Sequence, residues 1–530
     1  MIYNADNIPA EVSGVSQQVS FAQPTVTEQD LNVKLGECVS RLGLVAPKAD
    51  LRVREKVLGK LDKILRELVQ ASFRAHGFTE EDSAKAGVLI LTFGSYRLGV
   101  AGPGADVDTL CVVPNLIDND IFFGEIVPKL GEMPEVTELV PVPGAYVPIC
   151  KMVFGGVDID LVPGRLLVKT LPPQLDLLNN AVLSRVDSDS IRSFNGVRVT
   201  DSILRVVPRR DTFRLALRAI KYWARKRGVY SNVLGYLGGV SWAMLTARVC
   251  QLYPNACASF IVNRFFRVYH EWKWPSPVEL TPTLTRVGDL HYQVWNPKMN
   301  PSDRKHLMPI ITPAYPAMNS TYNVSRSTKA VLLEEFNEGA NVTYEIMQKR
   351  APWSALFQPV KFFESFKYYL MIEAAADSED SLGPWSGFVE SRLRRLVAKL
   401  EEVEHVSRIR PFPRKFSPPV GENVEHRVFR HAATWFVGFE VTRARNVEVN
   451  LTVPTHLFRE LSITNDPKFY KPDENGINFS LFKQRNLPVW LLELLREEEE
   501  EEDQLVEQVG DDRTGTTATG TKDGADTRKR

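Results

Sequence analysis

The sequence predicts an α+β protein with several domains. The chain has 530 residues, of which 44% are hydrophobic and 25% are charged, as is typical of globular proteins. At about 150 residues per domain, this length corresponds to three or four domains. A stretch of mixed helical and strand-like pattern, a mostly helical stretch and a second mixed stretch follow one another along the chain, and this order indicates α+β domains on either side of a helical one.

The first mixed domain is predicted over residues 50–205. Apolar residues recur at helical spacing from Asp50 to His76, and this period predicts one long helix. Three short aliphatic runs then predict buried strands at Val88–Phe93, Val107–Val113 and Val157–Val162. A domain boundary is predicted near Pro208, just before a strong helix that starts at Asp211 or Thr212.

The rest of the chain divides into a helical region, a mixed region and a tail. Residues 206–351 are mostly helical, with Pro-rich interruptions at 274–282 and 301–316. Residues 352–496 are mixed. Their predicted elements are a helix over Trp385–Val403 and strands over Phe362–Ile372, Ala432–Val441 and Val447–Val453. Residues 497–530 are predicted to be a disordered acidic tail, because their glutamate run and Gly/Thr/Asp segment bury little apolar area.

Charge is unevenly distributed along the chain. Lys and Arg together number 65, as do Asp and Glu, but residues 497–530 hold twelve acids and five bases, so residues 1–496 carry a net +7. A mildly basic body is compatible with an anionic partner. Five cysteines without a C-x-x-C spacing indicate neither a disulfide framework nor a zinc site, and they favour an intracellular protein. We expect no membrane span and no signal peptide, since no stretch of about 18 apolar residues occurs.

Two carboxylates enter the second predicted strand shortly after a glycine turn. The first strand ends at Phe93, Gly94 and Ser95 follow, and after ten intervening residues come Asp106 and Asp108. Residues two apart in a strand point to the same face, so these carboxylates project together. They repel each other unless a cation lies between them, and Mg²⁺ binds through one or two carboxylates together with substrate phosphates. Gly94 would let a main-chain N–H approach a phosphate closely.

A third strand repeats the acidic pattern with Asp158 and Asp160 among apolar neighbours, where an unpaired acid would be costly to bury. A bare D-x-D is commonly a solvated pair in a turn, but the upstream Gly-Ser and the third acid favour a three-carboxylate metal site. Asp158 and Asp160 remain alternatives, because both point to the same face. Such a site suits an in-line displacement at phosphorus, in which one metal activates a hydroxyl and the other clamps a triphosphate.

Basic and glycine residues downstream complete the pattern. The helix from Asp211 carries a basic face, which is usually solvated, formed by Arg214, Arg218, Lys221 and Arg225. Gly238 and Gly239 precede a helix that begins near Val240, and N–H groups at such a helix start favour phosphate.

Long colinear blocks resemble eukaryotic poly(A) polymerases. They include F-G-S-Y-R-L-G-V with G-A-D-V-D-T-L-C-V-V-P, F-N-G-V-R-V-T-D at 194–201, the block at 213–232, G-G-V-S-W-A-M-L at 238–245 and M-P-I-I-T-P-A-Y-P at 308–316. The resemblance covers at least residues 50–450. It implies a polymerase β-like nucleotidyltransferase catalytic domain (50–205), a helical nucleotide-binding middle domain (206–351) and an RNA-recognition-like C-terminal domain (352–496), with residues 1–49 packed on the middle domain.

The resemblance also implies an activity and a set of site residues. The activity is template-independent addition of AMP from ATP to an RNA 3′ end, with two Mg²⁺ or Mn²⁺ ions and release of pyrophosphate. The implied catalytic and metal-binding acids are Asp106, Asp108 and Asp160. The implied ATP contacts are Phe93, Gly94, Ser95, Gly102, Asp160, Lys221, Tyr230, Asn232, Gly239 and Val240, and the implied RNA or base contacts are Val147, Lys151 and Asn195. Some relatives carry a lysine where this chain reads Gly102-Pro103-Gly104, so phosphate contact there would come from the backbone.

Further expectations concern RNA, partners and location. The C-terminal domain lacks the aromatic RNP signature, so base stacking on its sheet is not expected. Backbone contact with RNA is expected instead from Arg392, Arg394, Arg395, Lys399, Arg408, Arg410, Arg414 and Lys415. The resemblance implies a nuclear, monomeric enzyme that works with the pre-mRNA cleavage and polyadenylation machinery. The alternatives are a uridylyl- or CCA-adding transferase and a catalytically inactive RNA-binding scaffold.

Overall fold

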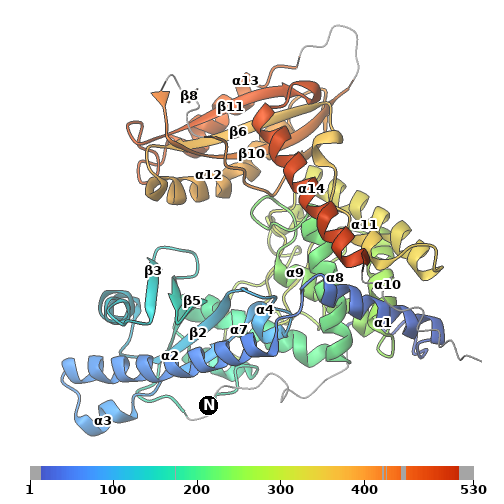
Figure 1. Cartoon of the computed structure of the whole chain (residues 1–530). Coiled ribbons are helices and arrows are strands. Elements are labelled where there is room, and N and C mark those ends of the chain that lie inside the picture. Colours follow the sequence, from blue (N-terminus) through green and yellow to red (C-terminus); the bar gives the residue numbers. More distant parts are fainter. Residues whose placement is uncertain (1–13, 173–174, 420–422, 425–426, 443–448, 512–530) are drawn as a thin grey trace, which may run out of the picture. The chain divides into compact units, whose positions relative to one another are not determined.

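The computed structural model describes residues 14–172, 175–419, 423–424, 427–442 and 449–511, and these form two compact units (Figure 1). The first unit contains the residues up to Lys361 together with Leu393–Glu402, and the second contains Phe362–Arg392 and the residues from Val403 onward. No helix in the described ranges is long and apolar enough to cross a lipid bilayer. All five cysteines are buried and free.

A five-stranded sheet with the order β1-β2-β5-β4-β3 lies in the N-terminal half of the first unit. Its strands are β1 (Leu89–Thr92), β2 (Val107–Pro114), β3 (Val136–Val142), β4 (Ile149–Phe154) and β5 (Val157–Leu166). β2 and β5 are parallel, and the other neighbouring pairs are antiparallel. The three strands predicted from aliphatic runs are confirmed as β1, β2 and β5. The hairpin β3–β4 was not predicted, because β3 is largely solvent-exposed and lacks a clear apolar period.

Helices cover both faces of this sheet. They are α2 (Lys48–Ala75), α3 (Glu80–Lys85), α4 (Gly94–Leu98), α5 (Asn119–Ile121), α6 (Val127–Gly131) and α7 (Ile191–Val206), with a π-helical turn η2 (Phe122–Ile126) and the 3₁₀ turns η3 (Asn180–Arg185) and η4 (Ser188–Ser190). On one face, Leu61 of α2 belongs to the same apolar cluster as Cys111 of β2. On the other face, Phe194 of α7 clusters with Leu110 of β2. Because β2 is buried on both faces, its sequence is a continuous apolar run.

The remainder of the first unit is helical. Its elements are α1 (Val26–Arg41), α8 (Arg210–Lys226), α9 (Gly239–Leu252), α10 (Ala258–Glu271) and α11 (Arg326–Met347), with the 3₁₀ turns η5 (Asp303–Lys305) and η6 (Trp353–Phe357). The buried ring of Trp223 lies 4.6 Å from that of Phe266 and 5.8 Å from that of Trp242. Helix α1 packs against α10 and α8, and its Leu31 carbonyl accepts a 2.9 Å hydrogen bond from Trp353 Nε1.

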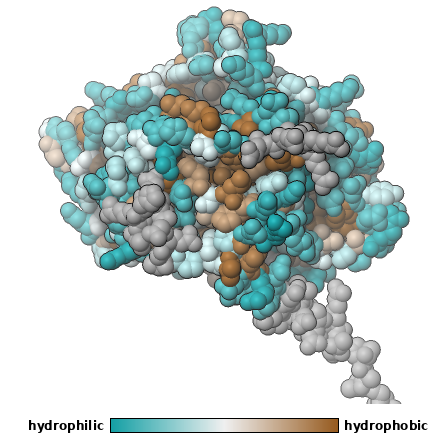
Figure 2. All heavy atoms as spheres, turned by 90° about the horizontal axis from the view of Figure 1, so that it is seen from above, coloured by the Kyte–Doolittle hydropathy of each residue, from teal (hydrophilic) through white to brown (hydrophobic). Residues whose placement is uncertain are grey.

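The second unit contains a four-stranded antiparallel sheet with the order β11-β6-β10-β7. Its elements are η7 (Phe362–Glu364), β6 (Tyr368–Ala376), α12 (Glu379–Leu400), β7 (Val406–Pro411), the short pair β8 (Asn423–Val424) and β9 (Arg427–Val428), β10 (His431–Val441), α13 (Thr452–Phe458), η8 (Arg459–Ile463), β11 (Asn475–Lys483), η9 (Gln484–Asn486) and α14 (Val489–Asp511). The surface seen in Figure 2 is mostly hydrophilic, with apolar side chains gathered in a few places.

Two predictions for this region are wrong. Val447–Val453 was predicted as a strand; residues 443–448 lie outside the described residues, and Thr452–Phe458 is helix α13, where Pro454 occupies the first turn, a position that tolerates proline. The tail was predicted to be disordered from residue 497, yet α14 continues through the glutamate run to Asp511. Glutamate and leucine are good helix formers, and Leu491 anchors this helix in the core. Residues 512–530 lie outside the described part of the chain.

Candidate active site

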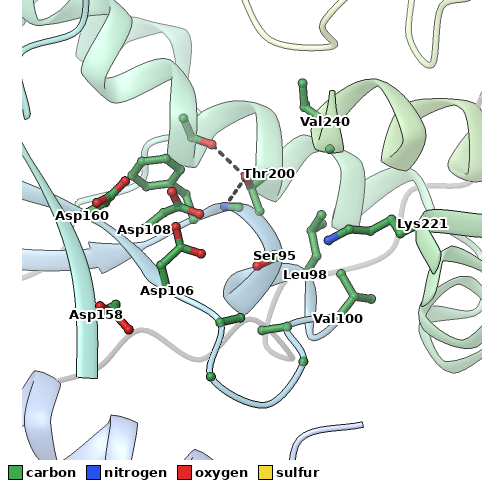
Figure 3. A pocket seen from close by; sticks show the side chains of 18 of the residues that line it. Ser95, Leu98, Val100, Asp106, Asp108, Asp158, Asp160, Thr200, Lys221 and Val240 are labelled. Atoms are coloured by element: carbon green, nitrogen blue, oxygen red, sulfur yellow. Dashed lines mark hydrogen bonds between the residues drawn. The ribbon is translucent and has the colours of Figure 1, made fainter. Parts of the chain in front are cut away.

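Three carboxylates meet where β2 and β5 run side by side. In the parallel pairing, Asp108 lies directly opposite Asp160, and Asp106 immediately precedes β2. One oxygen from each of these three carboxylates lies within 4.8 Å of the others (Figure 3). Asp158 lines the same cavity but is exposed and stands outside this group.

The electrostatics of the three acids fit a bound cation. Burial, followed by repulsion from Asp106 and Asp160, raises the pKa of Asp108 to about 7. The ammonium of Lys151, which lies opposite Asp160 on β4, donates to both of its carboxylate oxygens at 3.2 and 3.0 Å. Clustered carboxylate oxygens are the ligands that Mg²⁺ prefers. The residues present therefore suit divalent cations, and Lys151 supplies positive charge beside one of them.

The turn after β1 lies directly against the acids. Gly94 has a left-handed backbone with φ of 63°, and a Cβ added to it would lie 2.1 Å from Oδ2 of Asp108. Its N–H, which was expected to approach a phosphate, donates to Oγ1 of Thr200 on α7 at 3.2 Å. The close approach that glycine allows is therefore to the carboxylate of Asp108. Ser95 also lines the cavity.

Helix α8 forms the opposite wall and presents Lys221 to the cavity (Figure 3). Burial, followed by the neighbouring Arg225, lowers the pKa of Lys221 to about 8. The expectation that the arginines of this face are solvated is wrong for two of them. Arg214 Nε donates to the carbonyl of Leu98 at 3.1 Å, and Arg218 Nη2 donates to the carbonyl of Gly99 at 2.5 Å. Arg225 is exposed but also lines the cavity.

The beginning of α9 forms another part of the cavity wall. Gly239, Val240 and Tyr230 all line it. A Cβ on Gly239 would lie 2.7 Å from the Tyr230 hydroxyl, so glycine is required for this close packing. The guanidinium of Arg225 lies 5.0 Å from the centre of the Tyr230 ring, which adds a cation–π contact.

The cavity has a volume of about 1300 Å³. Most residues implied by the resemblance line it: Phe93, Gly94, Ser95, Gly102, Asp106, Asp108, Lys151, Asp160, Asn195, Lys221, Tyr230, Gly239 and Val240. Val147 and Asn232 are not part of its wall. Two buried amide oxygens, Oδ1 of Asn195 and Oδ1 of Asn232, have no hydrogen-bond partner among the described residues.

The sequence analysis did not identify several residues that support the site through hydrogen bonds and an ion pair. Thr200 and Asp201 stand at the end of the motif F-N-G-V-R-V-T-D, and Asp201 forms a buried two-point ion pair with Arg97 at 2.9 and 3.2 Å. Arg54 of α2, only 3% exposed, donates to the carbonyl of Gly102 at 3.1 Å. Nothing in local periodicity identifies these partners, because each pair is more than 45 residues apart in the chain.

Family models of three poly(A) polymerase domains match most of residues 14–429. The model of the poly(A) polymerase nucleotidyltransferase domain matches residues 14–207, that of the central domain matches 212–359, and that of the predicted RNA binding domain matches 361–429. The RNA terminal uridylyl transferase Cid1 has a solved structure that covers 63% of this chain and 99% of its own, with a TM-score of 0.44 and 14% identity.

Curated relatives agree with the domain matches. Nuclear poly(A) polymerase 1 of Arabidopsis thaliana is 46% identical over 76% of this chain and 56% of its own length. Nuclear poly(A) polymerase 4 of the same plant is 49% identical over 73% of this chain and 52% of its own, so the chain spans about half the length of these plant relatives. Poly(A) polymerase pla1 of Schizosaccharomyces pombe is 46% identical over 76% of this chain and 71% of its own. With three matching domains in order and a relative covered over most of its length, this chain belongs to the poly(A) polymerase family.

Proposed function

We propose that this protein is a polynucleotide adenylyltransferase that adds AMP from ATP to the 3′ end of RNA without a template. The observation that carries the proposal is the juxtaposition, across one cavity, of three carboxylates and a partly buried lysine. Carboxylates at one wall suit metal-assisted phosphoryl transfer, and a cation at the other suits a triphosphate. Family membership selects the adenylyltransferase among the reactions that this chemistry allows.

Asp106, Asp108 and Asp160 are assigned to hold two divalent cations, Mg²⁺ or Mn²⁺. When bound, such ions lower the pKa of an attacking hydroxyl and stabilise charge on a leaving pyrophosphate. Asp160 is assigned the further role of accepting the proton of the RNA 3′-hydroxyl. Its place in the carboxylate group and in the cavity wall supports this role.

The nucleotide is assigned to the opposite wall. Lys221 neutralises the triphosphate, while Tyr230, Asn232, Ser95, Gly102 and the start of α9 at Gly239 contact ATP. Phe93 and Val240 are assigned to the faces of the adenine. Asn232 is assigned on the resemblance alone, since it is not part of the cavity wall.

The RNA end is assigned to Val147, Lys151 and Asn195, of which the last two line the cavity. The C-terminal unit is assigned to the upstream RNA backbone. Its central strands β6 and β10 are buried on both faces, which leaves no open aromatic platform for bases. Of the basic residues expected to contact RNA, Arg395, Arg408 and Lys415 are exposed, whereas Arg410 is buried and is withdrawn from that set.

Location and partners follow from the family. We infer a nuclear protein that acts with the pre-mRNA cleavage and polyadenylation machinery, because the plant relatives are named nuclear poly(A) polymerases.

Primer extension tests the activity. The purified chain is incubated with an oligo(A) RNA and Mg²⁺ or Mn²⁺, with ATP, UTP, CTP or GTP as the sole nucleotide. Extension with ATP, lost in the Asp106→Asn variant, is the expected result. Extension mainly with UTP would point to a uridylyltransferase, and addition limited to C and A would point to a CCA-adding enzyme. RNA binding without extension by any nucleotide would leave an RNA-binding scaffold and overturn the proposal.

A further inference from the structure

One face of α7 contacts the turn that follows β1, and this turn packs against Asp108. Gly196 and Thr200 are four residues apart and lie on this face, and Asp201 follows Thr200 directly in the chain. A Cβ added to Gly196 would lie 2.9 Å from Cδ2 of Phe93, so the helix backbone packs directly on that ring. The face thus meets the chain at the end of β1.

The Thr200 hydroxyl both donates and accepts a hydrogen bond. It donates to the carbonyl of Gly196 at 2.8 Å and accepts the N–H of Gly94 at 3.2 Å (Figure 3). The side chain is only 5% exposed, so water does not readily replace it. Removing the hydroxyl would leave the N–H of Gly94 without this partner. A buried N–H without a hydrogen-bond partner is costly, so the loss would disfavour the present position of the turn.

The next residue anchors the other end of the same turn. Asp201 is 4% exposed and forms its two-point ion pair with Arg97, which is 5% exposed. Consecutive residues of α7 therefore hold positions 94 and 97, one turn of chain apart. From the other side, Arg214 holds the carbonyl of Leu98. The turn is thus fixed between the helix that follows the sheet and the helix that carries the cavity lysine.

The position of this turn determines where the carboxylate of Asp108 can lie. Since a Cβ on Gly94 would lie 2.1 Å from Asp108 Oδ2, the backbone of Gly94 forms one wall around this carboxylate. A shift of the turn by a few tenths of an ångström would change the space available to the carboxylate, and the Ser95 hydroxyl would move with it. The hydroxyl that fixes the turn is more than 90 residues away in the chain.

We propose that Thr200 is a positioning residue for catalysis, which acts through Gly94 to set the orientation of Asp108 toward its cation. Asp201, through Arg97, holds the other end of the same turn. The proposal rests on the proposed function for its kinetic consequences, but the metal-binding consequence is independent of the substrate.

Three variants of the full chain test this inference. Thr200→Val keeps the shape and removes the hydroxyl, and Thr200→Ser keeps the hydroxyl and removes a methyl group. Thr246→Val is the matched control, because Thr246 is also buried in a helix and also donates to the carbonyl four residues earlier, at 2.8 Å. Its helix, α9, continues away from the cavity at this position, and Thr246 is not part of the cavity wall.

The kinetic readout separates positioning from general stability. We expect Thr200→Val to lower kcat roughly 10- to 100-fold, the scale on which small misplacements of reacting groups act, and to raise the Mg²⁺ concentration needed for half-maximal rate. KM for ATP should change less than kcat. Thr200→Ser should recover most of the rate, and Thr246→Val should keep the wild-type kcat although its Tm also falls.

A second readout does not depend on activity. The rise in Tm caused by Mn²⁺ alone should be smaller in Thr200→Val than in the wild type, Thr200→Ser and Thr246→Val. If the wild type adds no nucleotide, the proposed function fails and this metal-binding comparison still decides the inference. An unchanged kcat and an unchanged Mn²⁺ response in Thr200→Val would overturn it, as would a Thr200→Ser variant as impaired as Thr200→Val.

Discussion

Asp108→Asn should stabilise the metal-free protein while abolishing its proposed activity. In the folded chain this carboxylate is largely buried beside Asp106 and Asp160, with one oxygen of each acid within 4.8 Å of the others. Asparagine has nearly the same shape and no charge. The substitution therefore removes repulsion without opening a cavity, and it also removes a proposed metal ligand.

The magnitude follows from the geometry. Two unit charges about 4.8 Å apart repel by about 3 kcal/mol at an effective dielectric constant of about 20. Independently, a pKa held near 7 instead of 3.8 corresponds to about 4 kcal/mol against the ionised form in the folded state at pH 8. Lys151 and Lys221 already offset part of the repulsion within that pKa, and asparagine has its own burial cost. We therefore expect a net gain of about 1–3 kcal/mol.

Thermal unfolding at pH 8 measures this gain. In EDTA, Asp108→Asn should unfold at a higher temperature than the wild type, and added Mg²⁺ should raise the Tm of the wild type but not that of the variant, because only the wild type keeps the cation site. Asp158→Asn is the control, since Asp158 is exposed and outside the carboxylate group, and it should change neither value. If the variant is no more stable than the wild type in EDTA, or if Mg²⁺ stabilises both equally, the reasoning about repulsion is refuted.

Three further predictions test other parts of the site. Asp160→Asn should lower the rate of AMP addition by more than about 100-fold, since metal assistance is worth several kcal/mol. The rate of Asp158→Asn should stay within about threefold of the wild-type rate. If primer extension shows the reverse order, Asp158 is the third acid. Because burial lowers the pKa of Lys221 to about 8, its charge is present below that pH and lost above it, so kcat/KM for ATP should fall as pH rises through about 8. Lys221→Arg should shift that fall to higher pH, and identical pH profiles would exclude the role. Arg414 pairs with Glu498 of α14 in a partly exposed ion pair, so Glu498→Gln should tighten RNA binding modestly at low salt and leave it unchanged at high salt; equal affinities across a salt series would show that the pair does not compete with RNA.

Prediction from sequence succeeded where a single segment carries the signal. The strands β2 and β5 are mostly buried and rich in aliphatic residues, so their composition and length identify them. The long helix α2 is recognisable because its apolar residues keep one period over 28 residues. Prediction failed for α13 and for the helical glutamate run. For α13, β-branched composition suggested a strand, and the burial of Phe458 stabilises the helix. For the glutamate run, low apolar content suggested disorder, but glutamate favours helix and Glu498 adds an ion pair.

The sequence by itself determined that two carboxylates share a face of one strand and that a third acid, either Asp158 or Asp160, lies on another, because side-chain alternation along a strand is a local property. Spacing alone leaves those two acids equivalent, and the resemblance implies Asp160. The tertiary structure adds the register that places Asp160 opposite Asp108 and brings it into the carboxylate group. It also decided that Arg214 holds the carbonyl of Leu98 and that Thr200 holds the N–H of Gly94. Periodicity determines which way a side chain faces, whereas packing of distant segments determines what it meets there.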